Sequence, residues 1–305
     1  MRWYVSGKVA LKSAIFIVVA GLVIGVSLFL FGIPLFNKTE PVKISDTFNL
    51  KRVQYRFQIW NTKNQPVTNV HFYVHAPLEQ TCAQRCIQIE SSYPYEVMTD
   101  PLGNQVLKYT FETFPPLATK VVSIQANLML ATSPVSSAKT ISVKGVNSNT
   151  EAINIRQLAN QLKSKTVHTT ALNIYRWVAD NITYTGYLKH AKGVRQTLAD
   201  RTGDCTEFAD LFVALVHAAK IPARRVSGYL SYENRVLKPT DFHDWAEFYE
   251  NGVWRIADPQ QKNFDANYPS YIAMKIYDHS AKNNSMGGFH RFYVDGKGLK
   301  AKMDT

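Results

Sequence analysis

Three residues that could form a catalytic triad occur in the second half of the chain. Cys205 begins an apolar stretch after the dipeptide GD, His243 lies in the segment FHDWAEFY, and Asp258 lies in WRIADP. A thiol can attack a carbonyl carbon, an imidazole can move the proton, and a carboxylate can orient the ring. These residue types in this order predict nucleophilic acyl chemistry, provided that the fold brings them together.

The residues after Cys205 predict an apolar helix that begins at the cysteine. Asp204 suits the N-cap and Glu207 the third helical position, which makes a capping box, and Pro222 should end the helix near Lys220. The amide N–H groups and the dipole of the first turn favour a thiolate at Cys205. The two acidic residues oppose this effect, so a reactive Cys205 requires a nearby imidazolium. The predicted buried stripe recurs at three and four residues: Phe208, Leu211, Phe212, Leu215, Val216 and Ala219.

The segment that carries His243 and Asp258 predicts a β-hairpin around an Asn-Gly turn. If Glu250 pairs with Val253, then His243 and Asp258 lie on the same face as diagonal neighbours. Such neighbours are roughly 7–8 Å apart at the backbone, within reach of an imidazole and a carboxylate. A shift of one residue in the register would place them on opposite faces. The predicted register therefore favours a working triad.

These motifs carry a family resemblance. The stretch GVRQTLADRTGDCTEFADLFVALVHAAKIPARRVSGYL, together with HDWAEFYENGVWRIADP, resembles the core of the transglutaminase-like superfamily of papain-like cysteine enzymes. The preceding IYRWVADNITYTGY is similar to that family's lead-in helix and aromatic segment. The resemblance implies that Cys205 is the nucleophile, His243 the general base and acid, and Asp258 the group that orients the imidazole.

Further residues are candidates for the same site. The backbone N–H of Cys205 is a natural oxyanion donor at a helix start, and Tyr184 or Tyr187 could supply a side-chain donor. The sequence departs from many family members at Asp244, where they have a small residue, and at Gln260, where they have threonine. Asp244 could add a second carboxylate that alters the pKa of the imidazole.

An uncharged stretch near the N-terminus predicts a membrane anchor. No charged side chain occurs from Ser13 to Asn37, and this run has the length needed to span a bilayer. Basic residues precede it, so the positive-inside rule places residues 1–12 in the cytoplasm and the rest on the periplasmic or cell-surface side. We expect a retained anchor over residues 13–36 rather than a cleaved signal peptide, because FGIPLFNKTE offers no good cleavage site.

Composition and strand patterns predict the remaining organisation. With 305 residues, of which 46% are hydrophobic and 19% charged, the chain is long enough for two globular domains. Alternating apolar runs separated by turn signals predict a β-sandwich over residues 37–148. This region also resembles the sandwich domain ahead of the catalytic core in bacterial membrane-anchored relatives. The predicted fold class is α+β, with an anchor, a sandwich and a transglutaminase-like core over residues 149–305.

For the other cysteines and for three histidines, the sequence favours structural roles. Cys82 and Cys86 lie in the predicted extracytoplasmic domain, where a disulfide that closes a small loop is the default expectation. A redox role for this pair is the alternative, although the spacing is not CxxC. His71 and His75 share one face of a strand without a third ligand nearby, so no metal site is expected. No cofactor is expected either, and His217 is expected to cap or pack near its helix end.

Charge and chemistry indicate the partners. The net charge of +12 is spread along the chain, which argues against a dedicated nucleic-acid surface and suits an anionic envelope. We expect a protein or peptide amide as substrate, with hydrolysis favoured over cross-linking because water needs no second binding groove. The alternative is a non-catalytic scaffold or assembly subunit that binds other envelope proteins.

Overall fold

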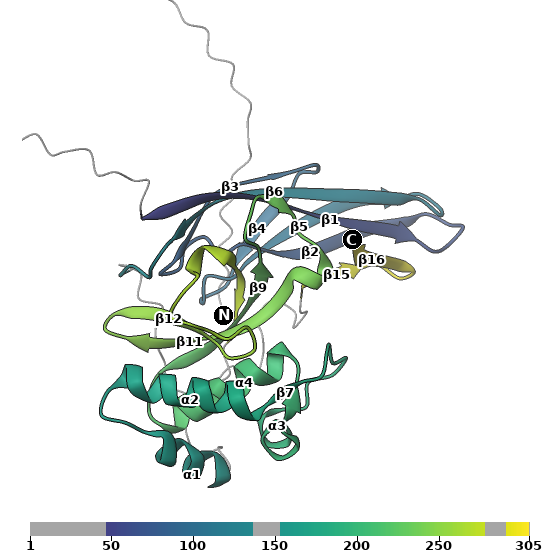
Figure 1. Ribbon diagram of the computed structural model, residues 1–305. Helices are drawn as coiled ribbons and strands as arrows, with labels where there is room; N and C mark the ends of the chain where they lie inside the picture. Colours follow the sequence, from purple (N-terminus) through teal and green to yellow (C-terminus); the bar gives the residue numbers. More distant parts are fainter. Residues whose placement is uncertain (1–46, 137–152, 278–290, 305) are drawn as a thin grey trace, which may run out of the picture.

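The computed structural model describes residues 47–136, 153–277 and 291–304. Its elements form three tiers, with two sheets at one end, a third sheet in the middle and helices at the other end (Figure 1). Within the described ranges, no helix is long and apolar enough to cross a membrane. The predicted anchor over residues 13–36 and the segment before it lie outside these ranges, so the membrane prediction is neither supported nor contradicted.

Two sheets of mainly antiparallel strands enclose the first core. The first sheet has the order β10-β1-β6-β3, with β16 also paired to β1, and the second has the order β15-β2-β5-β4. The strands are β1 (Phe48–Asn61), β2 (Val67–Ala76), β3 (Gln84–Ser91), β4 (Glu96–Thr99), β5 (Gln105–Phe114), β6 (Thr119–Ala131), β10 (Arg235–Val236), β15 (Phe292–Asp295) and β16 (Leu299–Met303).

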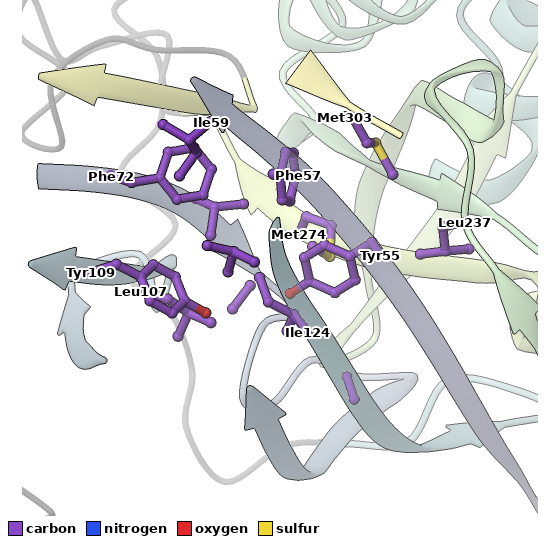
Figure 2. Close-up of a cluster of buried hydrophobic side chains, with 14 of the residues drawn as sticks. Tyr55, Phe57, Ile59, Phe72, Leu107, Tyr109, Ile124, Leu237, Met274 and Met303 are labelled. Carbon is purple, nitrogen blue, oxygen red and sulfur yellow. The ribbon is translucent and has the colours of Figure 1, made fainter. Parts of the chain in front are cut away.

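Alternation along β1 builds this core. Val53, Tyr55, Phe57 and Ile59 are at most 1% exposed, as their spacing predicted, because alternate side chains of a strand point to the same face. Facing side chains of the second sheet, including Phe72 and Tyr109, complete the cluster. Figure 2 shows that Leu237, Met274 and Met303 join it from distant parts of the chain.

The last strands of the chain return to the first two sheets. β16 runs antiparallel to β1, with Phe57 opposite Met303, and β15 runs antiparallel to β2, with Phe292 opposite Val74. β15 and β16 thus belong to the same two sheets as β1 to β6. Their side chains complete the apolar core that the preceding strands leave open at its edges. Local periodicity in the sequence does not predict this pairing, because the paired strands are far apart in the chain.

A third sheet and four helices hold the candidate site. The sheet has the order β13-β12-β11-β9-β14, and α4 lies against β11 (Figure 1). Its strands are β9 (Ala223–Leu230), β11 (Phe242–Glu250), β12 (Val253–Asp258), β13 (Asn263–Phe264) and β14 (Tyr271–Ile276). The helices are α1 (Ile153–Leu162), α2 (Val167–Asn181), α3 (Val194–Asp200) and α4 (Cys205–Ala218), and short strands β7 (Thr183–Tyr184) and β8 (Thr202–Gly203) pair beside α4.

The expected disulfide between Cys82 and Cys86 is absent from this structure. Cys82 is buried, and its sulfur accepts a hydrogen bond from the backbone N–H of Trp254 at 3.4 Å. Cys86 lies on β3, where the strand continues past it in the ladder with β6. The cysteines thus occupy different settings, one against the third sheet and one within the first, rather than the ends of a closed loop.

Candidate active site

Cys205 is the first residue of α4, as the spacing predicted. Asp204 is the N-cap, its side chain accepts from Thr206 N–H, and the capping box with Glu207 is present. The Cys205 thiol is free, and the residue is half-buried. Its amide belongs to the first helical turn, whose N–H groups have no acceptor within the helix.

The capping-box carboxylates also hold the chain segment that precedes the helix. Asp204 Oδ2 accepts from Leu188 N–H at 2.9 Å, and Glu207 Oε1 accepts from Lys192 N–H at 2.9 Å. Burial raises the pKa of Glu207, and the neighbouring Asp204 raises it further. Gly203 allows this packing, because a Cβ there would lie 2.4 Å from Glu207 Cβ. One wall beside Cys205 is therefore built by the same two carboxylates that begin the helix.

The hairpin register brings His243 and Asp258 together. Glu250 pairs with Val253 as predicted, and His243 Nε2 lies 2.6 Å from Asp258 Oδ2. His243 is 5% exposed and Asp258 is 1% exposed, so water screens this contact only weakly. Because Nε2 is hydrogen-bonded to Asp258, Nδ1 is the ring nitrogen that can exchange a proton with Cys205.

The electrostatics of His243 link all three residues. Burial alone lowers the pKa of the imidazole, but the charge and hydrogen bond of Asp258 outweigh it. A side-chain hydrogen bond with Cys205 and the charge of its sulfur act in the same direction, and the pKa rises to about 10. The ring is therefore an imidazolium at neutral pH, which is the partner that a reactive Cys205 requires.

Two aromatic residues support the pair, and the sequence patterns did not single them out. Tyr271 OH donates to Asp258 Oδ2 at 2.9 Å from the start of β14, which β9 and β11 separate from β12 in the sheet. Trp245 is 1% exposed. Its ring stacks on the imidazole of His243, with 6.4 Å between the ring centroids. It also meets the ring of Tyr271 edge-on, with 5.1 Å between the centroids. The two-residue spacing of Trp245 from His243 is a signal that could have found it. Tyr271 has no comparable signal, because its contact depends on the placement of β14.

Asp244 does not act on His243 as the sequence suggested. Successive residues of a strand point to opposite faces, so Asp244 is directed away from the imidazole. It is 1% exposed and accepts hydrogen bonds from Thr206 Oγ1 and Ser227 Oγ. The charges that move the pKa of His243 are those of Asp258 and Cys205.

The two oxyanion candidates lie in different settings. Tyr184 on β7 is adjacent to Gly203 on β8, and its pKa is raised by burial and by the charges of Cys205 and Asp204. Tyr184 therefore lies close in the fold to the start of α4, and it is 51% exposed. Tyr187 is 79% exposed in the following segment. An oxyanion role remains a prediction for both tyrosines.

The remaining histidines have other settings. Among the described residues, no group of three or more His, Cys, Asp or Glu side chains could hold a metal ion. His71 Nδ1 lies 3.2 Å from Thr110 Oγ1, whereas His75 is 3% exposed. His217 Nε2 lies 2.7 Å from the carbonyl oxygen of Ala223, which places it near the end of α4 as expected.

Comparisons with known proteins identify the core. Residues 156–259 match the family model of the transglutaminase-like superfamily, and no curated protein matches the chain. A candidate cysteine protease from Cytophaga hutchinsonii superposes with a TM-score of 0.51 at 16% identity, over 84% of this chain and 92% of that one. It therefore shares the fold.

Two other solved structures are less similar. The periplasmic domain of TgpA from Pseudomonas aeruginosa has a TM-score of 0.36 at 15% identity, over 67% of this chain and 87% of that one. LapG from Legionella pneumophila has a TM-score of 0.35 at 16% identity, over 45% and 86%. This chain has a mixed α+β fold with a transglutaminase-like core, where residues 156–259 match the family model.

Proposed function

We propose that the protein is a cysteine enzyme that cleaves a carboxamide or peptide bond through Cys205, His243 and Asp258. The observation that carries this proposal is the position of His243, which lies 2.6 Å from Asp258 and whose pKa is raised by Asp258 and by Cys205. A raised pKa of about 10 makes the ring an imidazolium that stabilises a thiolate. This arrangement supports nucleophilic catalysis better than a binding role, because a binding surface requires no such pair.

Acylation begins with attack of the Cys205 thiolate on the carbonyl carbon of the amide. The S–C bond forms, the oxyanion accepts a hydrogen bond from the N–H of Cys205, and Tyr184 is a side-chain candidate for a second donor. The imidazolium of His243 then gives its proton to the leaving amine nitrogen, and the C–N bond breaks. A thioester and a neutral imidazole remain.

Deacylation uses the same groups in reverse. Cys205 contributes to the raised pKa of His243, so forming the thioester lowers that pKa and makes the ring a better base. His243 then takes a proton from water, the resulting hydroxide adds to the thioester carbonyl, and the S–C bond breaks. A carboxylic acid leaves, and the thiolate–imidazolium pair is restored. An amine in place of water would give cross-linking, which needs a second binding groove.

The proposed setting is an extracytoplasmic membrane surface. The uncharged run over residues 13–36, preceded by basic residues, supports an anchor with a cytoplasmic N-terminus. The substrate is then a protein or peptide of the cell envelope, and other envelope proteins are possible partners. No cofactor is needed for this chemistry.

Mass spectrometry of a mixed peptide library tests the reaction. The wild-type chain is incubated in H₂¹⁸O with a labelled alkylamine, and each product is weighed. Hydrolysis gives new termini or deamidated side chains that carry ¹⁸O, whereas transfer gives products that carry the amine. Cys205→Ala should abolish both.

Cys86→Ala is the matched control for this experiment. Burial raises the pKa of Cys86 to about 11, and the residue lies on β3 away from α4, so its loss should leave the products unchanged. Identical products from the wild type and Cys205→Ala would contradict the proposed function and favour the scaffold alternative.

A further inference from the structure

A partly buried hydrogen bond joins the residues that follow the two reacting groups. Thr206 comes directly after Cys205 on α4, and Asp244 comes directly after His243 on β11. Thr206 Oγ1 donates to Asp244 Oδ2 at 2.7 Å. The bond therefore spans the helix that carries the thiol and the strand that carries the imidazole, on the side away from the triad.

The other oxygen of Asp244 is fixed as well. Ser227 lies opposite Asp244 in the ladder between β9 and β11, and its hydroxyl donates to Asp244 Oδ1. Ser227 is fully buried and Asp244 is 1% exposed. A buried carboxylate is tolerated only where its oxygens are satisfied, and here both have a hydroxyl donor. Its direction is thus set by three elements together.

Charged side chains from three other elements lie near this carboxylate. Arg225 of β9 forms an ion pair with Asp210 of α4 at 2.7 Å, and Lys275 of β14 lies nearby. Burial raises the pKa of Asp210 to about 6. The charge of Asp244 adds to this rise, and the charge of Arg225 counteracts it. Burial lowers the pKa of Lys275 to about 8, and Asp244 opposes that shift. Two acids and two bases thus form one buried network behind the site.

We propose that Asp244 is a positioning residue, which holds the start of α4 through Thr206 so that Cys205 meets His243. This inference rests on the proposed function. A displacement of the nucleophile by about 1 Å can lower the reaction rate about 100-fold. The hydrogen bond between Thr206 and Asp244 is therefore expected to affect the rate, because it joins the residues next to both reacting groups. Asp244 touches no substrate, and its effect passes through the placement of Cys205.

The reactivity of Cys205 toward iodoacetamide tests this proposal without a known substrate. At about pH 6.5, the ordinary pKa of histidine, a simple thiol is almost wholly protonated and reacts slowly. Cys205 of the wild type should react faster there than in the denatured chain, and faster than Cys86. Thr206→Val removes the hydroxyl and keeps the shape. It should slow Cys205 about tenfold at this pH and move the reaction profile toward that of an ordinary thiol.

Matched variants separate positioning from general damage. Thr206→Ser keeps the donor and should react within about threefold of the wild type. Thr170→Val removes the hydroxyl of a buried threonine on α2, which donates to Thr166 O at 2.8 Å, and should leave the profile unchanged. If Thr206→Val fails to fold, Thr206→Ala removes the same donor without adding bulk.

A double-mutant cycle checks that the bond is the cause. Asp244→Asn should also slow Cys205, and the combination with Thr206→Val should be no slower than the slower single variant. A wild-type profile in Thr206→Val, or additive losses in the cycle, would overturn the positioning role while the enzyme proposal stands. Slow wild-type labelling that matches the denatured chain would overturn both.

Discussion

Tyr271 and His243 share one oxygen of Asp258. The phenol lies 2.9 Å from Oδ2 and the imidazole lies 2.6 Å from it, while Oδ1 accepts from Gln261 N–H at 3.1 Å. Three donors therefore fix the carboxylate, and its direction fixes the ring. In the proposed reaction, Tyr271 would act through Asp258.

Removing the phenol hydroxyl should reduce catalysis. In Tyr271→Phe we expect kcat on the peptide identified by mass spectrometry to fall about tenfold, because a hydrogen bond to a charged group contributes about 1.5 kcal/mol or more. KM should stay unchanged. Tyr229→Phe is the control, since it removes a buried hydroxyl that donates to Met303 Sδ in the other core. Equal kcat in Tyr271→Phe and the wild type would contradict the role.

The raised pKa of His243 also predicts how stability depends on pH. The folded value is about 10, above the ordinary value of 6.5, so the folded state binds the proton more tightly. This contribution to the free energy of unfolding is fully present below pH 6.5 and is lost as the pH rises toward 10.

Urea unfolding of the wild type and His243→Gln measures this contribution. The difference between their free energies of unfolding should be largest near pH 6 and should shrink steadily toward pH 10. A difference that grows with pH would mean that the imidazole is neutral in the folded protein.

At the scale of single residues, the features that could be predicted from the sequence are those that depend on residues nearby in the chain. The capping box of Asp204 and Glu207 follows from a three-residue spacing, and the helix start at Cys205 follows from it. The expectation that Asp244 alters the pKa of His243 was wrong, because strand alternation turns Asp244 to the opposite face. Tyr271 could not be predicted, because only the folded sheet brings it to Asp258.

At the scale of elements, the segment from Leu188 to Lys192 depends on two buried carboxylates. Glu207 accepts from Lys192 N–H through Oε1 and from Asp204 N–H, 3.0 Å away, through Oε2. An amide has only one oxygen, so Glu207→Gln leaves one of these N–H donors facing an NH₂ group. The wall beside Cys205 should then loosen.

Amide hydrogen exchange measures that loosening. In Glu207→Gln we expect faster exchange at Leu188 and Lys192 and a loss of about 1–3 kcal/mol in the free energy of unfolding. Glu112→Gln, on an exposed position of β5, should change neither. Unchanged exchange in Glu207→Gln would show that other contacts hold the segment.

The third sheet shows where sequence prediction ended for the elements. The register of β11 and β12 was predicted because a two-residue turn fixes it. The pairing of β14 with β9 was not, because the strands are separated by the whole hairpin. Gly228 marks that approach, since a Cβ there would lie 1.9 Å from the carbonyl oxygen of Ile272. A glycine inside a strand indicates that another segment packs closely against it, but it does not identify that segment.

At the scale of the whole molecule, buried polar contacts join the first two sheets to the third. Lys51 of β1 is 6% exposed, and its ammonium group donates to the carbonyl oxygens of Ser231 and Pro269. Gln84 of β3 donates to Ala273 O at 3.0 Å and accepts from its N–H at 2.8 Å. Ala273 lies on β14, as Tyr271 does. The first sheets therefore brace the strand that supports Asp258, which a loosely attached spacer would not do.

The core around Met303 makes the same connection from the C-terminus. Met303 is 5% exposed, belongs to the cluster shown in Figure 2, and lies beside Tyr229 of the third sheet. Truncating a buried methionine to alanine costs about 2–5 kcal/mol. In Met303→Ala we expect a loss of this size, and one shared unfolding transition, because the strands that close the first core also contact the sheet of the site.

Thermal unfolding followed by two probes tests the prediction. Circular dichroism reports the sheets, and the reactivity of Cys205 reports the site. Both midpoints should fall together in Met303→Ala, whereas Met98→Ala, at a half-buried position on β4, should cost less. If circular dichroism shifted while the site kept its wild-type midpoint, the two halves would unfold separately. Coincident shifts would mean that the last strand stabilises the catalytic sheet as well as the core it completes.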